Sequence, residues 1–271
     1  MKGLNAPLPG IEVKAILNKK VSFMNAKGKS VKIKAALQET GSAGFKKYRE
    51  LYYGNVSLGS IIKAELLFLL IGSLPGAIGL FLRSKLYPSL FGHVSGRLLI
   101  GRNVTFRHLK KIRFGANVII DDNCVIDAKG VDNDGITIED DVFIGRNTII
   151  YCKNGNIRLK RGVNISSSCT VFSSNQLTME ANTMVGAYTF LLSGGEYDYT
   201  NRQTPFVDQT GMETKGSLTI GSNCWLGARV TVTDASSIGN HCVIGAGAVV
   251  TKPIPADSLA VGIPAKVVKL I

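Results

Sequence analysis

Two neighbouring stretches near the C-terminus decide the fold. Residues 220–232 read I-G-S-N-C-W-L-G-A-R-V-T-V, and residues 238–250 read I-G-N-H-C-V-I-G-A-G-A-V-V. In both, an aliphatic residue recurs every six positions, followed by a small or polar residue, two turn residues and then a small residue. A period of six differs from the 3.6-residue period of an α-helix, and it indicates short strands separated by tight corners.

The same hexad extends far upstream. Hexads begin at Phe114, Ile120, Ile126, Ile138, Ile144, Ile150, Leu159, Ile165, Val171, Met179, Val185, Leu191, Ile220, Leu226, Val232, Ile238, Ile244 and Val250, and an earlier partial coil starts at Ile100. Three hexads make one triangular coil, and stacked coils pair strand to strand at about 4.8 Å. The sequence therefore predicts an all-β solenoid of six full coils and one partial coil over residues 98–271.

Each place in the hexad has a physical role. The first-place aliphatic points into the prism, and the fifth place also faces inward but accepts only a small side chain. The fourth place lies at a corner where φ can be positive, which asparagine and glycine tolerate best. The residues expected to fill that role are Asn103, Asn117, Asn123, Asn147, Asn182, Asn223, Gly162 and Gly247.

The hexad also accounts for residues that could suggest a metal site. Cys124, Cys169, Cys224 and Cys242 all occupy the fifth place, so we interpret them as small core residues. Cys152 lies outside the pattern and is interpreted as a packed or partly exposed thiol. With five cysteines and no C-x-x-C pair, the sequence favours neither disulfides nor zinc. His241 occupies a corner place, where a solvated turn residue is expected and a catalytic partner is the alternative.

Charge is concentrated at one end of the chain. Residues 1–113 hold 20 Lys+Arg against four acids, a net of +16, whereas residues 114–271 hold 12 against 15, a net of −3. This asymmetry argues against a nucleic-acid-binding role for the chain as a whole. We expect residues 1–45 to be a flexible basic segment.

Residues 46–97 contain an apolar run. Residues 66–82 carry no charge but are interrupted by Gly72, Pro75, Gly76 and Gly79, so one spanning helix is not expected. Two short helices fit better, either lying on an anionic membrane surface or capping the open end of the solenoid. Basic residues flank the run and favour the membrane, namely Lys46, Lys47, Arg49, Arg83, Lys85, Arg97, Arg102, Arg107, Lys110, Lys111 and Arg113.

The quoted stretches, followed by T-K-P-I-P and V-G-I-P-A-K-V-V-K, resemble the hexapeptide-repeat O-acyltransferases, many of which acetylate sugars of cell-surface polysaccharide or lipopolysaccharide. The resemblance runs from about Tyr52 to the end. It implies a left-handed parallel β-helix, a homotrimer with sites between subunits, and acetyl-CoA as co-substrate without a metal. The pantetheine arm would pass Gly227, Ala228, Gly245 and Ala246, and Lys252 and Lys266 are candidates for the coenzyme phosphates.

A polar insertion at residues 193–217 interrupts the hexads, and long polar loops of this kind are usually functional. In the family this loop holds a histidine, often followed by Asp, that deprotonates the acceptor hydroxyl. Aligning Asp198 with that Asp places Tyr197 where the histidine is expected, and the loop has no histidine. A neutral phenol is not a base at neutral pH. Glu196 or Asp198 is therefore the expected base, with Tyr197 as a hydroxyl donor.

The sequence thus predicts an acetyl-CoA-dependent O-acyltransferase that acts on a sugar or glycolipid and lies on the inner face of a membrane. Cytoplasmic localisation is expected from the cysteine usage and from the lack of a secretory signal. A catalytically silent trimer on the same scaffold is the alternative, because the histidine is missing. A metal hydratase would need three converging histidines, and His93, His108 and His241 are not so placed in the sequence. The acceptor sugar, its hydroxyl and the acyl chain length are not indicated.

Overall fold

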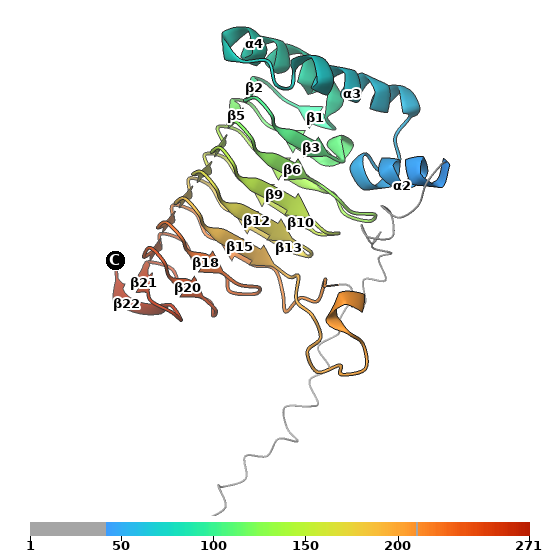
Figure 1. Ribbon diagram of the computed structural model, residues 1–271. Coiled ribbons are helices and arrows are strands. Elements are labelled where there is room, and N and C mark those ends of the chain that lie inside the picture. Colours follow the sequence, from blue (N-terminus) through green and yellow to red (C-terminus); the bar gives the residue numbers. More distant parts are fainter. Residues whose placement is uncertain (1–41, 210) are drawn as a thin grey trace, which may run out of the picture.

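The computed structural model describes residues 42–209 and 211–271. Most of the segment 1–45, which is expected to be flexible, lies outside these residues. The described chain is a column of triangular coils with helices across its N-terminal end and the C-terminus at the opposite end (Figure 1). The predicted fold class, a mainly β protein with a parallel β-helix and an N-terminal helical segment, is confirmed.

Three sheets form the sides of the prism, and their strands run parallel except for the last. Sheet A contains β1 (His93–Val94), β4 (Ile112–Phe114), β7 (Ile136–Ile138), β10 (Asn156–Leu159), β13 (Gln176–Met179) and β16 (Leu218–Ile220). Sheet B contains β2 (Leu98–Ile100), β5 (Val118–Ile120), β8 (Phe143–Ile144), β11 (Asn164–Ile165), β14 (Met184–Val185), β17 (Trp225–Leu226), β19 (Val243–Ile244), β21 (Ser258–Val261) and the antiparallel β22 (Lys266–Leu270). Sheet C contains β3 (Thr105–Arg107), β6 (Val125–Asp127), β9 (Ile149–Cys152), β12 (Thr170–Ser173), β15 (Phe190–Ser193), β18 (Thr231–Val232) and β20 (Val249–Val250).

The predicted hexads set the register of all three sheets. In sheet B, for example, Ile120 pairs with Ile144, Ile144 with Ile165, and Ile165 with Val185. Every predicted first-place residue from Phe114 to Val250 is buried. Because inward side chains of successive coils are stacked directly on one another, the core is a continuous apolar column.

The structure corrects the coil count at both ends. The first coil is complete, since Val94 pairs with Phe114 and Phe106 pairs with Ile126. The sequence pattern misses it because the spacing from Phe106 to Phe114 is eight residues, with the 3₁₀ turn η2 (Leu109–Lys111) inserted there. A partial eighth coil follows Val250: Ile254 bridges to Ile238, and Ala260 pairs with Ile244. The step from Val250 to Ile254 spans only four residues, which breaks the six-residue spacing.

The predicted corners are confirmed. Each of the eight asparagine and glycine residues expected at a fourth place has a positive φ, between 55° for Asn223 and 73° for Gly162. The predicted inward cysteines are also confirmed, because Cys124, Cys169, Cys224 and Cys242 are buried. Cys152 is buried as well, at the end of β9. Desolvation raises the pKa of the Cys124 and Cys224 thiols to about 11, so these thiols are protonated at neutral pH.

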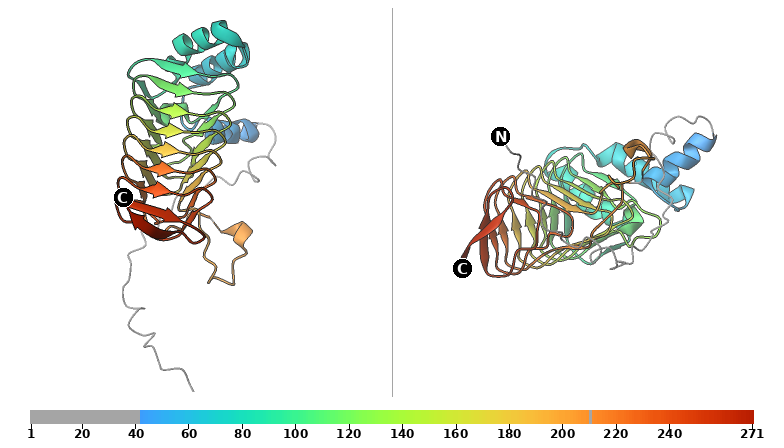
Figure 2. Two further views of the ribbon diagram at one scale, coloured as in Figure 1. Left: turned by 90° about the vertical axis from the view of Figure 1, so that its left-hand side faces the viewer. Right: turned by 90° about the horizontal axis from the view of Figure 1, so that it is seen from below.

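Three helices precede the solenoid, α2 (Ser42–Tyr52), α3 (Leu58–Ile71) and α4 (Gly76–Leu86), followed by the 3₁₀ turn η1 (Tyr87–Leu90). The apolar run thus forms two short helices broken around Pro75, as predicted. Both lie across the open end of the first coil (Figures 1 and 2). Ile61, Ala64 and Ile71 of α3 join the solenoid core, so the helices are a cap. Among the described helices, none combines the length and apolarity needed to cross a bilayer.

Arg83, which the sequence analysis placed among the basic residues beside a membrane, has another role. Arg83 is buried and donates hydrogen bonds to the carbonyl oxygens of Ile71, Leu74 and Ile100. It therefore satisfies carbonyls at the end of α3 and at the edge of the first coil. The interpretation of Arg83 as a residue that flanks a membrane surface is wrong.

Candidate active site

The insertion leaves the solenoid at the end of β15 and returns at β16, at the corner between sheets C and A. It projects from the side of the column and contains the 3₁₀ turn η3 (Phe206–Asp208) (Figures 1 and 2). Backbone hydrogen bonds in both directions between Glu196 and Glu213 tie its two limbs together. The loop is therefore a structured arm with a hairpin-like base.

Asp234 holds this base to the solenoid. Its buried carboxylate accepts hydrogen bonds from the backbone N–H of Gly194, the backbone N–H of Lys215 and the hydroxyl of Thr214. The Asp234 side chain, which belongs to the next coil, thus forms hydrogen bonds with both ends of the arm. The sequence analysis did not single out Asp234. The available signal is an acid at the third hexad place, where the two preceding coils hold Ser173 and Ser193.

Replacing Asp234 by Asn tests this anchoring. The amide turns one accepting oxygen into a donor, so a backbone N–H of the arm loses a charge-assisted bond of about 1.5–3 kcal/mol. We expect the backbone amides of Gly194 and Lys215 to exchange hydrogen at least about 10-fold faster, because local opening becomes easier. Glu213→Gln, an exposed change in the same arm, serves as the control and should leave exchange unchanged. Equal exchange in Asp234→Asn and the parent would show that the arm is held by other contacts.

The three predicted catalytic residues occupy one limb of the arm but have different surroundings. The Glu196 carboxylate is partly buried and forms an ion pair of 2.8 Å with the Lys215 ammonium. The hydrogen bond from Lys215 to Glu196 raises the pKa of that lysine. Glu196 therefore lies at the foot of the arm beside a cation, next to the solenoid.

Tyr197 and Asp198 are involved in the arm's own structure. The exposed Tyr197 ring packs edge-on against Phe206 and covers Gly211, where an added Cβ would lie 2.6 Å from the ring. The Asp198 carboxylate accepts hydrogen bonds from Thr200 and Asn201, and the Thr200 side chain is the largest cause of its lowered pKa. Several hydrogen bonds from the loop hold this carboxylate, whereas the exposed Lys215 side chain contacts that of Glu196, which leaves Glu196 as the better candidate.

The predicted coenzyme residues lie at another corner. Gly227 and Ala228 follow β17, and Gly245 and Ala246 follow β19, so all four are at the corner between sheets B and C. The packing of successive coils also explains why glycine is present at these positions. A Cβ on Gly227 would lie 2.6 Å from the backbone nitrogen of Ala246, and one on Gly245 would lie 2.7 Å from Val261. Close stacking of successive coils therefore requires glycine there, whether or not a coenzyme binds.

Lys252 and Lys266 both belong to the last turns of the chain and are exposed. Lys252 follows β20 and Lys266 begins β22. Val249 links the two regions, since its N–H donates to Gly262 and its carbonyl accepts from Ala265. The two ammonium groups are thus placed at the C-terminal end of the column, beyond the glycine corner.

Known proteins share parts of this sequence and fold. Residues 217–252 match the family model of the bacterial transferase hexapeptide, six repeats. The chain carries the hexapeptide repeat of bacterial transferases. A Staphylococcus aureus protein named provisionally as an acetyltransferase is 39% identical over 43% of this chain and 56% of its own length. The galactoside O-acetyltransferase of Escherichia coli is 27% identical over 45% of this chain and 57% of its own.

The chain thus spans little more than half the length of the curated relatives it matches. Among solved structures, a mutant of the N-acyltransferase AntD from Bacillus cereus, in complex with dTDP-4-amino-4,6-dideoxyglucose and coenzyme A, is 20% identical with a TM-score of 0.49. That match covers 69% of this chain and 88% of the AntD chain.

Within one subunit, the hexapeptide-repeat solenoid keeps the two parts of the predicted site apart. The arm with Glu196 leaves the C–A corner, whereas Gly227 and Gly245 lie at the B–C corner, and sheet C separates them. A coenzyme along the B–C corner would therefore lie away from Glu196 of the same chain.

Two residues at the B–C corner escaped the sequence analysis. Tyr188 and Arg229 have φ near 60°, which is uncommon for bulky residues, and the Arg229 guanidinium lies 5.8 Å from the Tyr188 ring centroid. Both are exposed beside Ala187 and Ala228. The signal that could have found them is a fourth hexad place filled by Tyr or Arg instead of Asn or Gly.

His241 is an exposed corner residue with φ of 54°, as expected for a turn histidine. Its ring nitrogens lie 3.3 Å from Asp257 Oδ1 and from Asn223 Nδ2. In the part of the chain that the structure describes, no three His, Cys, Asp or Glu side chains are grouped so that they could hold a metal ion.

Proposed function

We propose that this chain is an acetyl-CoA-dependent O-acyltransferase that modifies a hydroxyl of a sugar used in cell-surface polysaccharide or glycolipid synthesis. The observation that carries the proposal is the arm that Asp234 anchors on a hexapeptide-repeat solenoid, with the Glu196 carboxylate at its foot. The match to the transferase repeat at residues 217–252 and the names of the relatives support it.

In the proposed reaction, the acceptor oxygen attacks the thioester carbonyl carbon. The new C–O bond forms, the C–S bond breaks, and the hydroxyl proton passes through Glu196 to the departing thiolate. Tyr197 is positioned on the same limb as a hydroxyl donor for the developing oxyanion. Glu196 must exchange its contact with Lys215 for the acceptor hydroxyl, and the exposed Lys215 side chain is free to rotate away.

The test is a coenzyme A release assay on the full chain with acetyl-CoA and a panel of sugars, nucleotide sugars and lipid-linked sugars. Acceptor-dependent release with acetyl recovered on oxygen supports the proposal. A protein that binds acetyl-CoA but transfers nothing would support the silent scaffold instead. The observations that favour this second candidate are the loop without histidine and the engagement of Glu196 and Asp198 with neighbouring groups.

The proposal includes a homotrimer with its sites between subunits, because one chain separates the arm from the B–C corner. The outward side chains of sheet B support an interface. They include Ile119, Met184 and Trp225, of which Trp225 is 58% and Met184 55% exposed. Outward positions of sheet A hold polar residues instead, such as Arg113, Arg158 and Thr219. An exposed apolar stripe on one side of a prism is typical of a protein–protein contact.

The trimer predicts a solution mass of about three times 29.0 kDa by light scattering. Trp225→Glu should shift the mass toward the monomer, because the charge would be buried in the interface. Thr219→Glu, at the outward position of sheet A in the same coil, is the matched control and should leave the trimer intact. A parent protein that stays monomeric at micromolar concentration would contradict both the trimer and the shared site.

We also propose that the capping helices rest on the cytoplasmic face of a membrane, where lipid-linked sugars are made. On α3, the outer face holds Leu58, Ile62, Leu66, Leu69 and Leu70, and on α4 it holds Ile78 and Phe81; all are more than half exposed. The inner face of α3 already covers the core, so the exposed outer face is available for another contact. Nearby cations such as Lys63 and Lys85 would favour an anionic leaflet.

A further inference from the structure

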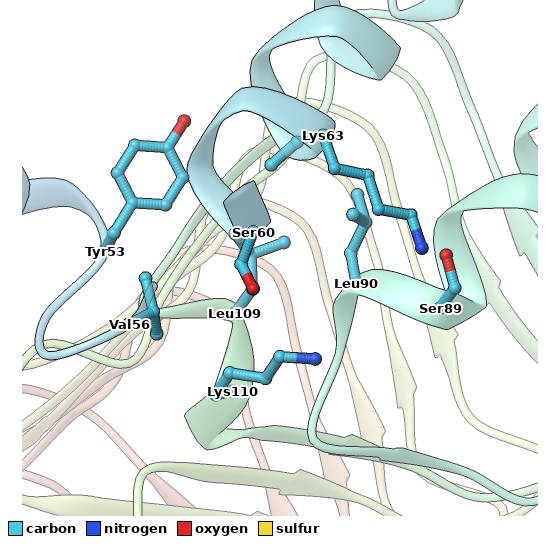
Figure 3. A pocket seen from close by; sticks show the side chains of 9 residues that line it. Tyr53, Val56, Ser60, Lys63, Ser89, Leu90, Leu109 and Lys110 are labelled. Atoms are coloured by element: carbon cyan, nitrogen blue, oxygen red, sulfur yellow. The ribbon is translucent and has the colours of Figure 1, made fainter. Parts of the chain in front are cut away.

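A small pocket lies beneath the first turns of α3, where η1 and η2 approach it. Its volume is about 90 Å³, and Figure 3 shows its lining side chains. We call it the cap pocket and define it by Ser60, Lys63, Ser89, Leu90, Leu109 and Lys110. The proposed acyl-transfer site uses none of these polar groups, and Lys63 also lies beside the exposed apolar face of α3.

Two cations and two hydroxyls converge on the cap pocket from separate elements. Lys63 and Ser60 come from α3, Ser89 from η1, and Lys110 from η2 (Figure 3). Within residues 42–209 and 211–271, neither lysine forms an ion pair with a carboxylate. The Lys110 ammonium donates one hydrogen bond, to the Phe91 carbonyl at 3.2 Å, and keeps two further donors.

The nearest acid on α3 is occupied elsewhere. Glu65 accepts hydrogen bonds of 2.6 Å from the hydroxyls of both Tyr48 and Tyr53. Desolvation and this bond raise the pKa of Tyr48 to about 12, so its hydroxyl remains a donor at neutral pH. Among the described residues, no carboxylate therefore balances the positive charge of Lys63 and Lys110 at the pocket.

The helix itself adds to the positive potential. Ser57 is the N-cap of the 14-residue α3, and its hydroxyl accepts from the N–H of Ser60. The pocket lies at the positive end of the helix dipole, which favours an anion. The buried Leu90 and Leu109 form an apolar wall on one side of the pocket, whereas Lys63 and Lys110 are exposed, so an anion can reach the two ammonium groups from solvent.

We infer that the cap pocket binds a phosphate group, held by the ammonium groups of Lys63 and Lys110. The lysines are the principal donors, because the Ser89 hydroxyl already donates to the Leu86 carbonyl and the Ser60 hydroxyl lies 2.9 Å from Ser57 Oγ. A tetrahedral anion with several acceptor oxygens suits two ammonium groups around so small a volume. Lys63 lies between Ile62 and Leu66 of the exposed apolar face. The phosphate could thus belong to a lipid headgroup or to a soluble phosphorylated compound. The inference does not depend on acyl transfer.

Two measurements on the full chain distinguish a lipid phosphate from a soluble one. In the first, binding is measured to phosphatidylcholine vesicles that contain phosphatidic acid, or phosphatidylserine at matched surface charge. All three lipids contain a phosphate, but only phosphatidic acid offers a terminal phosphate monoester, so a site for such a lipid phosphate predicts tighter binding to phosphatidic acid by about 10-fold or more. In the second, thermal unfolding is followed with inorganic phosphate against chloride at equal ionic strength. A free phosphate predicts a higher Tm in phosphate.

The variant Lys63→Gln/Lys110→Gln should abolish whichever effect the parent shows, the preference for phosphatidic acid or the rise of Tm in phosphate. Lys85→Gln removes an exposed charge of α4 outside the pocket. This variant should retain that effect and lose only general electrostatic binding to anionic vesicles. The acetyl-transfer rate with a soluble acceptor should stay unchanged in all variants, which keeps this result separate from the proposed activity. If the parent shows neither effect, or if Lys85→Gln loses as much as the double variant, the cap pocket is not a phosphate site.

Discussion

Replacing Glu196 by Gln is expected to lower the turnover number of acetyl transfer by about 10²-fold or more while acetyl-CoA binding persists. Glutamine keeps the size and polarity of the side chain but cannot accept the hydroxyl proton. The effect should appear in kcat, because the proton moves only as the acceptor attacks. Steady-state kinetics with a saturating acceptor, together with a coenzyme-binding measurement, give the two quantities separately.

Glu213→Gln is the matched control for this experiment. Glu213 lies opposite Glu196 in the same hairpin, is exposed, and shares its backbone pairing. It should retain the parent rate to within a few-fold, since its side chain has no assigned part in the reaction. If Glu196→Gln kept the full rate of an active enzyme, Glu196 would not be the base. His241 from a neighbouring subunit would then become the next candidate.

The double change Leu69→Glu/Leu70→Glu is expected to reduce binding to anionic vesicles by at least about 10²-fold. These leucines are 78% and 67% exposed on the outer face of α3. Each should contribute about 1.5–3 kcal/mol when it leaves water for lipid, and the substitutions add repulsion from the anionic surface. Vesicle flotation at two salt concentrations measures the loss and its electrostatic share.

Val268→Glu is the control for the membrane experiment, because Val268 is an exposed apolar residue of β22 at the opposite end of the column. Its flotation should match that of the parent. Point changes are preferable to deletion of the helices, since Ile61, Ala64 and Ile71 cover the first coil and their removal would expose core. A parent protein that binds neutral and anionic vesicles equally would remove the electrostatic part of the proposal.

The solenoid could be predicted almost residue by residue, because its information is local and repeated. An aliphatic residue every sixth position, a small fifth residue and an asparagine or glycine corner each follow from the space available in one coil. The pairing of Ile120 with Ile144 and the positive φ of Asn147 repeat that local rule. Only coils with irregular sides were missed, such as those of Phe106 and Ile254, where the spacing departs from six.

The candidate site was predictable only in part. The sequence marked the interrupted repeat and the acids within it, because an insertion is visible as a break in the period. It did not indicate that Asp234 grips both ends of the arm, since that contact joins residues 19 and 40 positions apart. It also did not distinguish the hydrogen-bonded Asp198 from the ion-paired Glu196, because neighbours in space decide the environment of each carboxylate.

The sequence by itself determined the repeat, the register and the inward cysteines, because each depends on residues within one or two coils. It also determined the break of the apolar run at Pro75, because that break depends on the residues at the break alone. Tertiary structure alone decided that Arg83 is buried between the cap and the first coil, and that Lys63 and Lys110 share a pocket. It also decided that the arm and the glycine residues lie at different corners of the prism. These features join side chains from separate coils and helices. Their positions follow from how the whole column stacks, which no short stretch of sequence encodes.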